Sequence, residues 1–354
     1  MDYVNNTIFQ ASRFPLDSFP SLKILQAAPF DSEVVSYYTK ISTVDVLETA
    51  RKTVGFRQSD GTEWSTEELI AMQFAYIKHL AEQVANEKVT DVVVAVPPYF
   101  SQFERDAVVD AIEISGLRTL ALINDGTAVA VNYAMTRTFA TPEYHIIYDA
   151  GASGIRATLA SFTAATDSKT GSSGTQIAVA GVGYDRNSGG TELDRRMREI
   201  LIDAFNAKTQ RDVREDKKGM VKLWKEAQRV KAILSANTEA VATIESLAWD
   251  IDFKTKVTRS AFENACKDLK GQFAKPIEDA LSNAGLTLVS LILFFAINFL
   301  LLIIYLLRTI LLLLFSPEVA PGYQWSKLLS KKRLEGTYLQ FFFFLLSYVY
   351  EPYQ

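Results

Sequence analysis

The segment Tyr148–Gly154 follows an apolar run and combines the carboxylate of Asp149 with glycines at Gly151 and Gly154. Glycine lets backbone amides approach phosphate oxygens, and a carboxylate can hold a metal-bound water. The next apolar run, Ile155–Phe162, can return as the second strand of a hairpin, and most Asp/Gly turns of this kind are ordinary hairpins. Taken alone, the segment fits either a phosphate site or a plain turn.

A second glycine-rich stretch comprises Gly181–Gly183 and Ser188–Thr191. It leads into a helical pattern in which we expect Thr191 to be the N-cap, with Asp194 three residues on. A helix N-terminus behind paired glycines can bind an anion, although in most proteins it is only a turn.

Three hydrogen-bonding side chains, Gln228, Lys231 and Ser235, are spaced three and four residues apart. This spacing places them on one face of a predicted helix, with apolar residues on another face. The pattern fits either a ligand platform or a solvated helix surface.

The elements that would position these residues alternate between helix and strand. Capping boxes begin at Ser65 and Ser101, each with a glutamate three residues later, and the second helix is expected to end at Gly116. Short apolar segments predict strands at 92–96, 119–123 and 145–148. A further helix is expected at 128–135, between the second and third of these strands. The chain therefore predicts an α/β sheet domain.

Composition excludes several classes of function. The 354 residues are 48% hydrophobic and 22% charged, so the chain can bury a core, and a net charge of −4 with scattered basic residues excludes a nucleic-acid binder. One cysteine, Cys266, excludes an internal disulfide, and its helical pattern predicts a buried small side chain. His79 and His145 lie far apart in the sequence, which argues against a zinc site or a histidine-based triad.

The amino-acid composition of the chain changes near Leu286. Residues 286–315 contain a single charged residue, Arg308, so we expect an apolar helical tail over 286–354 with a membrane-spanning helix at 286–307 or 286–315. The basic cluster at 327–333 would then face the cytosol. A long buried helix and low-complexity sequence are the alternatives. Residues 1–10 carry neither a basic nor an apolar region, so no signal peptide is expected there.

The order of these motifs resembles the actin-like ATPase domain of the seventy-kilodalton heat-shock chaperone family, from about Gln10 to about Leu288. The similarity rests on Val94–Phe100 with Gln102 and Arg105, on Leu122–Ala128, and on Asp149–Gly154. It implies two lobes, a partial lobe I over 1–140 and an incomplete lobe II over 141–285, around a cleft for ATP or ADP with Mg²⁺.

Two further segments, Gly181–Arg186 and Arg229–Asn237, are similar to the large hypoxia-upregulated, glucose-regulated branch of the family. This resemblance implies residence in the lumen of the endoplasmic reticulum, a role in protein folding during stress, and unfolded client proteins as partners. It also implies nucleotide exchange for an ordinary luminal heat-shock chaperone.

The resemblance assigns roles to particular residues. It implies catalytic roles for Lys23, Asp125 and Asp149, and it places Asp149 near magnesium as well. The backbone and side chains expected to contact phosphate belong to Gly151, Ser153, Gly189 and Gly190. The residues expected to contact adenosine are Lys231 and Ser235. Phosphoryl transfer depends on positioning and charge neutralisation, which these residue types supply.

Departures from the family pattern weaken the expectation of catalysis. The family's first phosphate loop would precede Gln10, where nothing resembles it, and its second-loop threonine falls on Gly154, which leaves Ser153 to supply a hydroxyl. Efficient ATP hydrolysis is therefore not implied. The alternatives to an ATP-binding chaperone are a nucleotide-independent interaction protein and a membrane-anchored remnant of such a domain.

Overall fold

The computed structural model describes residues 13–166, 171 and 173–287. All of them belong to one unit of mutual contacts, Met1–Leu288. The predicted apolar tail and its spanning helix lie outside the described residues, except for Leu286 and Thr287. None of the helices in the described ranges is both long enough and apolar enough to cross a bilayer.

The first described elements form a small antiparallel sheet with two helical segments. They are η1 (Leu22–Leu25), α2 (Glu33–Ile41), β1 (Val46–Glu48), β2 (Val54–Arg57) and β3 (Glu63–Ser65). The sheet order is β1-β2-β3. Tyr38 from α2 and Phe56 from β2 are fully buried and meet edge to face, so α2 is fixed against the sheet through an aromatic core.

A parallel strand pair with two helices follows. It consists of α3 (Thr66–Ala85), β4 (Asp91–Val96), α4 (Gln102–Ile114) and β5 (Arg118–Asn124), with β4 and β5 parallel. Both predicted capping boxes are confirmed, because the hydroxyls of Ser65 and Ser101 each accept a hydrogen bond from the third helical amide. In return, the backbone amide of each serine donates to the carboxylate of the glutamate at that third position. The second helix ends at Ile114, two residues before the expected Gly116.

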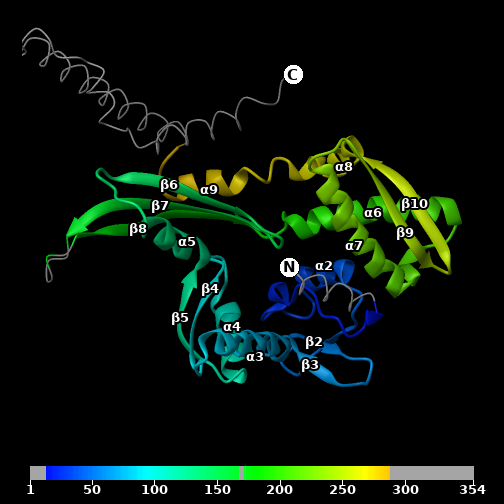
Figure 1. The fold of residues 1–354 in the computed structure, drawn as a ribbon, viewed down its shortest axis with the longest axis horizontal. Helices are drawn as coiled ribbons and strands as arrows, with labels where there is room; N and C mark the ends of the chain where they lie inside the picture. Colours follow the sequence, from blue (N-terminus) through cyan, green and yellow to red (C-terminus); the bar gives the residue numbers. More distant parts are fainter. Residues whose placement is uncertain (1–12, 167–170, 172, 288–354) are drawn as a thin grey trace, which may run out of the picture. The chain divides into compact units, whose positions relative to one another are not determined.

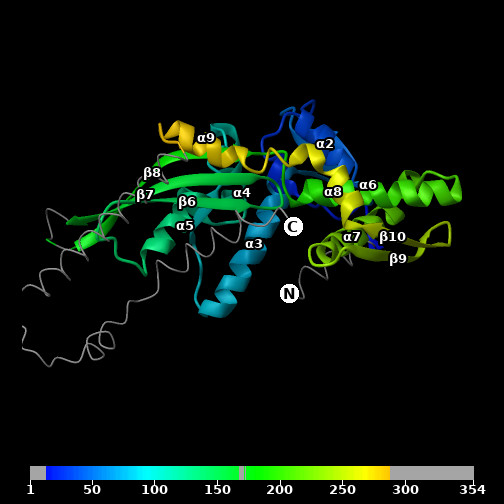
Figure 2. The same ribbon diagram turned by 90° about the horizontal axis from the view of Figure 1, so that it is seen from above.

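The next sheet contains three antiparallel strands, β6 (Glu143–Ala150), β7 (Ile155–Thr166) and β8 (Ser173–Asp185). The helices α5 (Asp125–Ala134) and α9 (Lys275–Asn283) cover its two faces, as Figure 1 shows. In Figure 2 α9 again lies along the strands. The hairpin expected from Tyr148–Phe162 is therefore confirmed, as β6 and β7 pair directly across the glycine turn.

Glycines make the contact between β8 and α9 possible. A Cβ on Gly181 would lie 2.0 Å from the carbonyl oxygen of Ala280, and one on Gly183 would lie 2.0 Å from that of Pro276. No side chain can fit there, so these two glycines let a helix backbone rest on a strand. This packing, rather than an anion, accounts for the Gly181–Gly183 part of the glycine-rich stretch.

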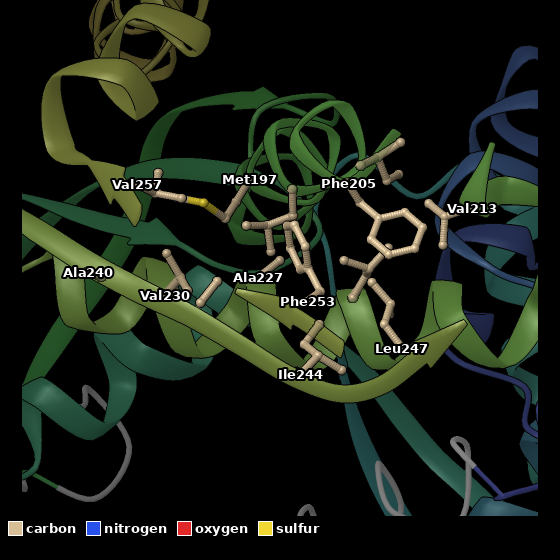
Figure 3. Packing of buried hydrophobic residues seen from close by; sticks show 14 of the residues in the cluster. Met197, Phe205, Val213, Ala227, Val230, Ala240, Ile244, Leu247, Phe253 and Val257 are labelled. Atoms are coloured by element: carbon tan, nitrogen blue, oxygen red, sulfur yellow. The ribbon is translucent and has the colours of Figure 1, made fainter. Parts of the chain in front are cut away.

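The largest core lies between two long helices and a strand hairpin. The elements are α6 (Gly190–Thr209), η2 (Val213–Glu215), α7 (Lys217–Leu234), β9 (Glu239–Ala248) and β10 (Ile251–Thr258), followed by α8 (Arg259–Ala265) and η3 (Lys267–Leu269). Phe205 and Phe253 are about 1% exposed and meet edge to face at the centre of this core (Figure 3). The core fixes α6 and α7 side by side, which positions the candidate site at their ends.

The expected α/β class is confirmed as a mixed architecture of helices and sheets. The division into lobes at residue 140 and the end of the second lobe at residue 285 stay predictions.

Candidate functional site

A cavity of about 500 Å³ brings together residues that are far apart in the sequence. Its lining includes Lys23 on η1, Ser153 in the turn between β6 and β7, and Gly189 at the start of α6. It also includes Asp268 on η3. Three of the predicted site residues, Lys23, Ser153 and Gly189, therefore share one cavity.

The two predicted phosphate loops are hydrogen-bonded to each other beside this cavity. The amide of Gly190 donates to the Gly151 carbonyl at 3.0 Å, and the amide of Thr191 donates to the Ala152 carbonyl at 2.9 Å. A Cβ on Gly189 would lie 2.4 Å from the Ala152 carbonyl oxygen and 2.7 Å from the Gly154 amide nitrogen. The loops thus interlock only because position 189 has no side chain.

The start of α6 differs from the sequence prediction. Thr191 was expected to be the N-cap, but the cap is Gly189, with no side-chain hydrogen bond, and the helix begins at Gly190. The reason is that the other loop supplies carbonyl acceptors to the first amides of α6, so a side-chain cap is not needed. The predicted phosphate contact from the Gly190 amide would have to replace its bond to Gly151.

The predicted adenosine platform divides into two parts. Lys231 Nζ lies 2.5 Å from Asp194 Oδ1 and donates to the Gly190 carbonyl at 3.1 Å, while Gln228 donates to Asp194 at 3.3 Å. Lys231 therefore supports the start of α6. Ser235 is the C-cap of α7, where its hydroxyl donates to the Ala232 carbonyl, and neither Lys231 nor Ser235 lines the cavity.

The two predicted catalytic carboxylates are joined by an arginine. Arg156 Nη1 lies 2.8 Å from Asp125 Oδ2, and Arg156 Nη2 pairs with Asp149 Oδ2. The arginine side chain is only 14% exposed, compared with 25% for Asp125 and 51% for Asp149. We call the three residues Asp125, Asp149 and Arg156 the carboxylate clamp.

Strand register and helix packing together produce the carboxylate clamp. Asp149 on β6 is directly opposite Arg156 on β7, and side chains at directly paired positions point to the same face of a sheet. Thr158, two residues further along β7, shares that face. A Cβ on Gly126 of α5 would lie 2.1 Å from Thr158 Oγ1, so Gly126 lets the start of α5 bring Asp125 against Arg156.

Lys23 stands next to the carboxylate clamp. Its side chain keeps substantial exposure at the cavity wall, yet partial desolvation there is the largest cause that lowers its pKa below the usual lysine value. The charge of Arg156 lowers the pKa further, and those of Asp125 and Asp149 raise it. These interactions place the lysine ammonium within electrostatic reach of all three clamp residues.

Other residues that line the cavity form a second ion-pair network. Glu192 accepts hydrogen bonds from Arg195 at 2.7 Å and from Arg196 at 2.8 Å, and Arg196 also donates to Asp268 at 2.7 Å. Desolvation would raise the pKa of Glu192, but the bonds from the two arginines outweigh it and lower that pKa. Burial, followed by the charge of Glu192, raises the pKa of the neighbouring Tyr37 to about 12.

Cys266 departs from expectation. It follows α8 as the C-cap residue rather than lying within the helix, and it is half-buried. Burial raises the pKa of its thiol, with the charge of Arg196 opposing this effect. A thiol of raised pKa is a poor nucleophile, which agrees with the expected packing role.

Some functional residues could not be found from the sequence. Arg156 is a charged residue within an otherwise uncharged strand, and its only signal is that it falls on the same face as Asp149 when β6 and β7 are paired. The Glu192–Arg196 network gave no signal, because its charges resemble those on any solvated helix face. Among the described residues no three His, Cys, Asp or Glu side chains are grouped to hold a metal ion.

The chain is similar to known proteins over most of its length. A model of the Hsp70 protein family matches residues 10–293. Hypoxia up-regulated protein 1 of Xenopus laevis is 45% identical over 246 residues, which cover 68% of this chain and 38% of that protein. Heat shock protein 70 homolog lhs1 of Schizosaccharomyces pombe is 39% identical over 284 residues, which cover 78% of this chain and 34% of that protein.

The human protein named Hypoxia up-regulated protein 1 is 39% identical over 245 residues, covering 67% of this chain and 24% of that protein. The chain thus spans between 24% and 38% of the length of these three relatives. Their names confirm the expected similarity to the hypoxia-upregulated branch. Because the family match covers most of the sequence and includes every residue of the candidate site, this chain belongs to the Hsp70 family.

Proposed function

We propose that the cavity binds ATP and ADP, with the phosphates between Lys23 and the two glycine loops. The main support is that Lys23, Ser153 and Gly189 line one cavity of about 500 Å³, a size typical of small-molecule sites. A phosphate can approach the backbone of the interlocked loops closely, and Lys23 supplies positive charge. The family's general use of a nucleotide supports the same assignment.

Magnesium fits this site less well than the nucleotide does. The predicted magnesium residue, Asp149, is paired with Arg156, and so is Asp125. A metal ion bound directly by these carboxylates would have to displace the guanidinium. Neither carboxylate lines the cavity, and we therefore assign no step to a metal held by the protein.

Replacing Lys23 tests the nucleotide site. Lys23→Met removes the ammonium but keeps a side chain of similar length, so ADP affinity is expected to fall by about tenfold or more, because a charge-assisted bond to phosphate is lost. Calorimetric titration of ADP into the full chain measures the change. Lys88→Met, at an exposed lysine after α3, is the matched control and should bind like the wild type.

The lowered pKa of Lys23 adds a pH dependence. Anion binding favours the charged ammonium, so ADP affinity should decrease as the pH rises toward that lowered pKa. This decrease should be absent in Lys23→Met. Equal affinities of the wild type and Lys23→Met at every pH would place the nucleotide elsewhere or exclude it.

The biological role that we propose is chaperoning in the endoplasmic reticulum, with unfolded proteins as clients and a luminal heat-shock chaperone as partner. Similarity to Hypoxia up-regulated protein 1 and to lhs1 supports this role. The chain spans 38% and 34% of these two relatives. The partner role that we propose for it is nucleotide exchange. Added to a luminal chaperone loaded with labelled ADP, the chain should speed ADP release, and an unchanged rate would count against the exchange role.

A further inference from the structure

The carboxylate clamp has the charge arrangement of a metal site with a side chain in place of the metal. Two carboxylates from different elements, Asp125 at the start of α5 and Asp149 at the end of β6, converge on the Arg156 guanidinium. A Cβ on Gly151 would lie 3.2 Å from Arg156 Nη2, so the glycine loop also leaves room for the arginine. The start of α5, the end of β6 and the glycine loop therefore together form the site that holds the guanidinium.

Charge balance makes a second cation at this position unfavourable. The charges of Arg156 and Lys23 neutralise the two aspartates, and all three clamp residues act on the pKa of Lys23. A divalent ion would place two further positive charges beside a guanidinium that is 14% exposed and therefore weakly screened. Displacing Arg156 instead would break two ion pairs and leave its charge without a partner, which is costly in a partly buried site.

We propose that Arg156 acts as a fixed cation in place of a divalent metal between Asp125 and Asp149, so that nucleoside diphosphate binds in the cavity beside the carboxylate clamp with little dependence on Mg²⁺. The clamp residues do not line this cavity themselves, but they act on Lys23, which does. The inference rests on the nucleotide site proposed above. It makes Arg156 a specificity-determining residue, because its charge removes the need for a magnesium ion when the nucleotide binds. Arg156 Nε–H is buried and finds no acceptor among the described residues, so the guanidinium retains an unused donor.

The first test compares ADP binding to the full chain in Mg²⁺ and in EDTA by calorimetry. The wild type should bind with dissociation constants that agree within about threefold, whereas Arg156→Gln should bind at least about tenfold more weakly in EDTA than in Mg²⁺, because the carboxylates then need a soluble cation. Arg118→Gln removes the same charge from a side chain that is 74% exposed on β5, and it should behave like the wild type. Loss of wild-type binding in EDTA would overturn the proposal.

The second test needs no nucleotide, and so separates this inference from the proposed function. Binding of Mn²⁺ is followed by electron paramagnetic resonance with the wild type, Arg156→Gln and the double variant Arg156→Gln/Asp149→Asn. Arg156→Gln should gain one Mn²⁺ site that the double variant loses, and the wild type should show none at this position. A wild-type Mn²⁺ site that Asp149→Asn removes would contradict the proposal even if Arg156→Gln failed to fold. Absence of ADP binding by the wild type in both buffers would contradict the nucleotide site instead.

Discussion

Replacing Gly189 with valine is expected to weaken ADP binding by about 100-fold, equivalent to roughly 2.7 kcal/mol. A Cβ at this position would overlap the Ala152 carbonyl oxygen at 2.4 Å and the Gly154 amide at 2.7 Å, so the two loops would have to separate. Separation would break the bonds from the Gly190 and Thr191 amides and move the backbone that faces the phosphates. Calorimetric titration of ADP measures the loss.

Gly174→Val is the matched control for this substitution. Gly174 lies on β8, away from the cavity, and an added Cβ there meets nothing within 4 Å. It should therefore leave ADP affinity unchanged. Circular dichroism shows whether Gly189→Val remains folded. If the folded variant bound ADP like the wild type, the interlocked loops would not form the nucleotide site.

The ion-pair network of Glu192, Arg195 and Arg196 in the cavity lining predicts a large change in stability. Glu192→Gln should lower the free energy of unfolding by about 2–3 kcal/mol near neutral pH, because Arg195 and Arg196 would lose the carboxylate that pairs with both. The value is below that of a fully buried pair, since the arginines are 23% and 17% exposed and Arg196 keeps Asp268. Urea unfolding measures it, with the exposed Glu239→Gln as the control.

The pH dependence of this difference has a defined sign. The folded pKa of Glu192 lies below its ordinary value of 4.5, so its stabilising contribution is present above 4.5 and is lost as the pH falls through the folded pKa. The difference in the free energy of unfolding between the wild type and Glu192→Gln should therefore have its full value near pH 7 and should disappear at acidic pH. A difference that stayed constant across this range would show that the carboxylate charge is not what stabilises this part of the cavity lining.

Local signals in the sequence predicted the elements well. The two capping boxes at Ser65 and Ser101 begin helices as expected, and the run before Asp149 is a strand that pairs with the next run across the glycine turn. Each of these features depends on residues that are neighbours in the sequence. The convergence of Lys23, Ser153 and Gly189 was instead implied by family resemblance, because no local pattern connects positions so far apart.

Features that depend on distant contacts could not be predicted. Gly181 and Gly183 belong to a glycine-rich stretch that could have bound an anion, but they serve the packing of α9, whose residues lie about a hundred positions later. Gly189, rather than Thr191, begins α6 because carbonyls of another loop satisfy its first amides. Arg156 is the most informative case: its partner Asp125 is 31 positions earlier, and only the packing of Gly126 against Thr158 brings them together.

Hydrogen exchange of the full chain with and without ADP, read by mass spectrometry, tests whether this cavity is the nucleotide site. We expect slower exchange on ADP addition in three segments at once, residues 21–26, 149–156 and 186–193, because Lys23 and both glycine loops would surround the phosphates. The core hairpin of β9 and β10 should change little. ADP binding that left these three segments unchanged and slowed exchange elsewhere would contradict the assignment of this cavity as the nucleotide site.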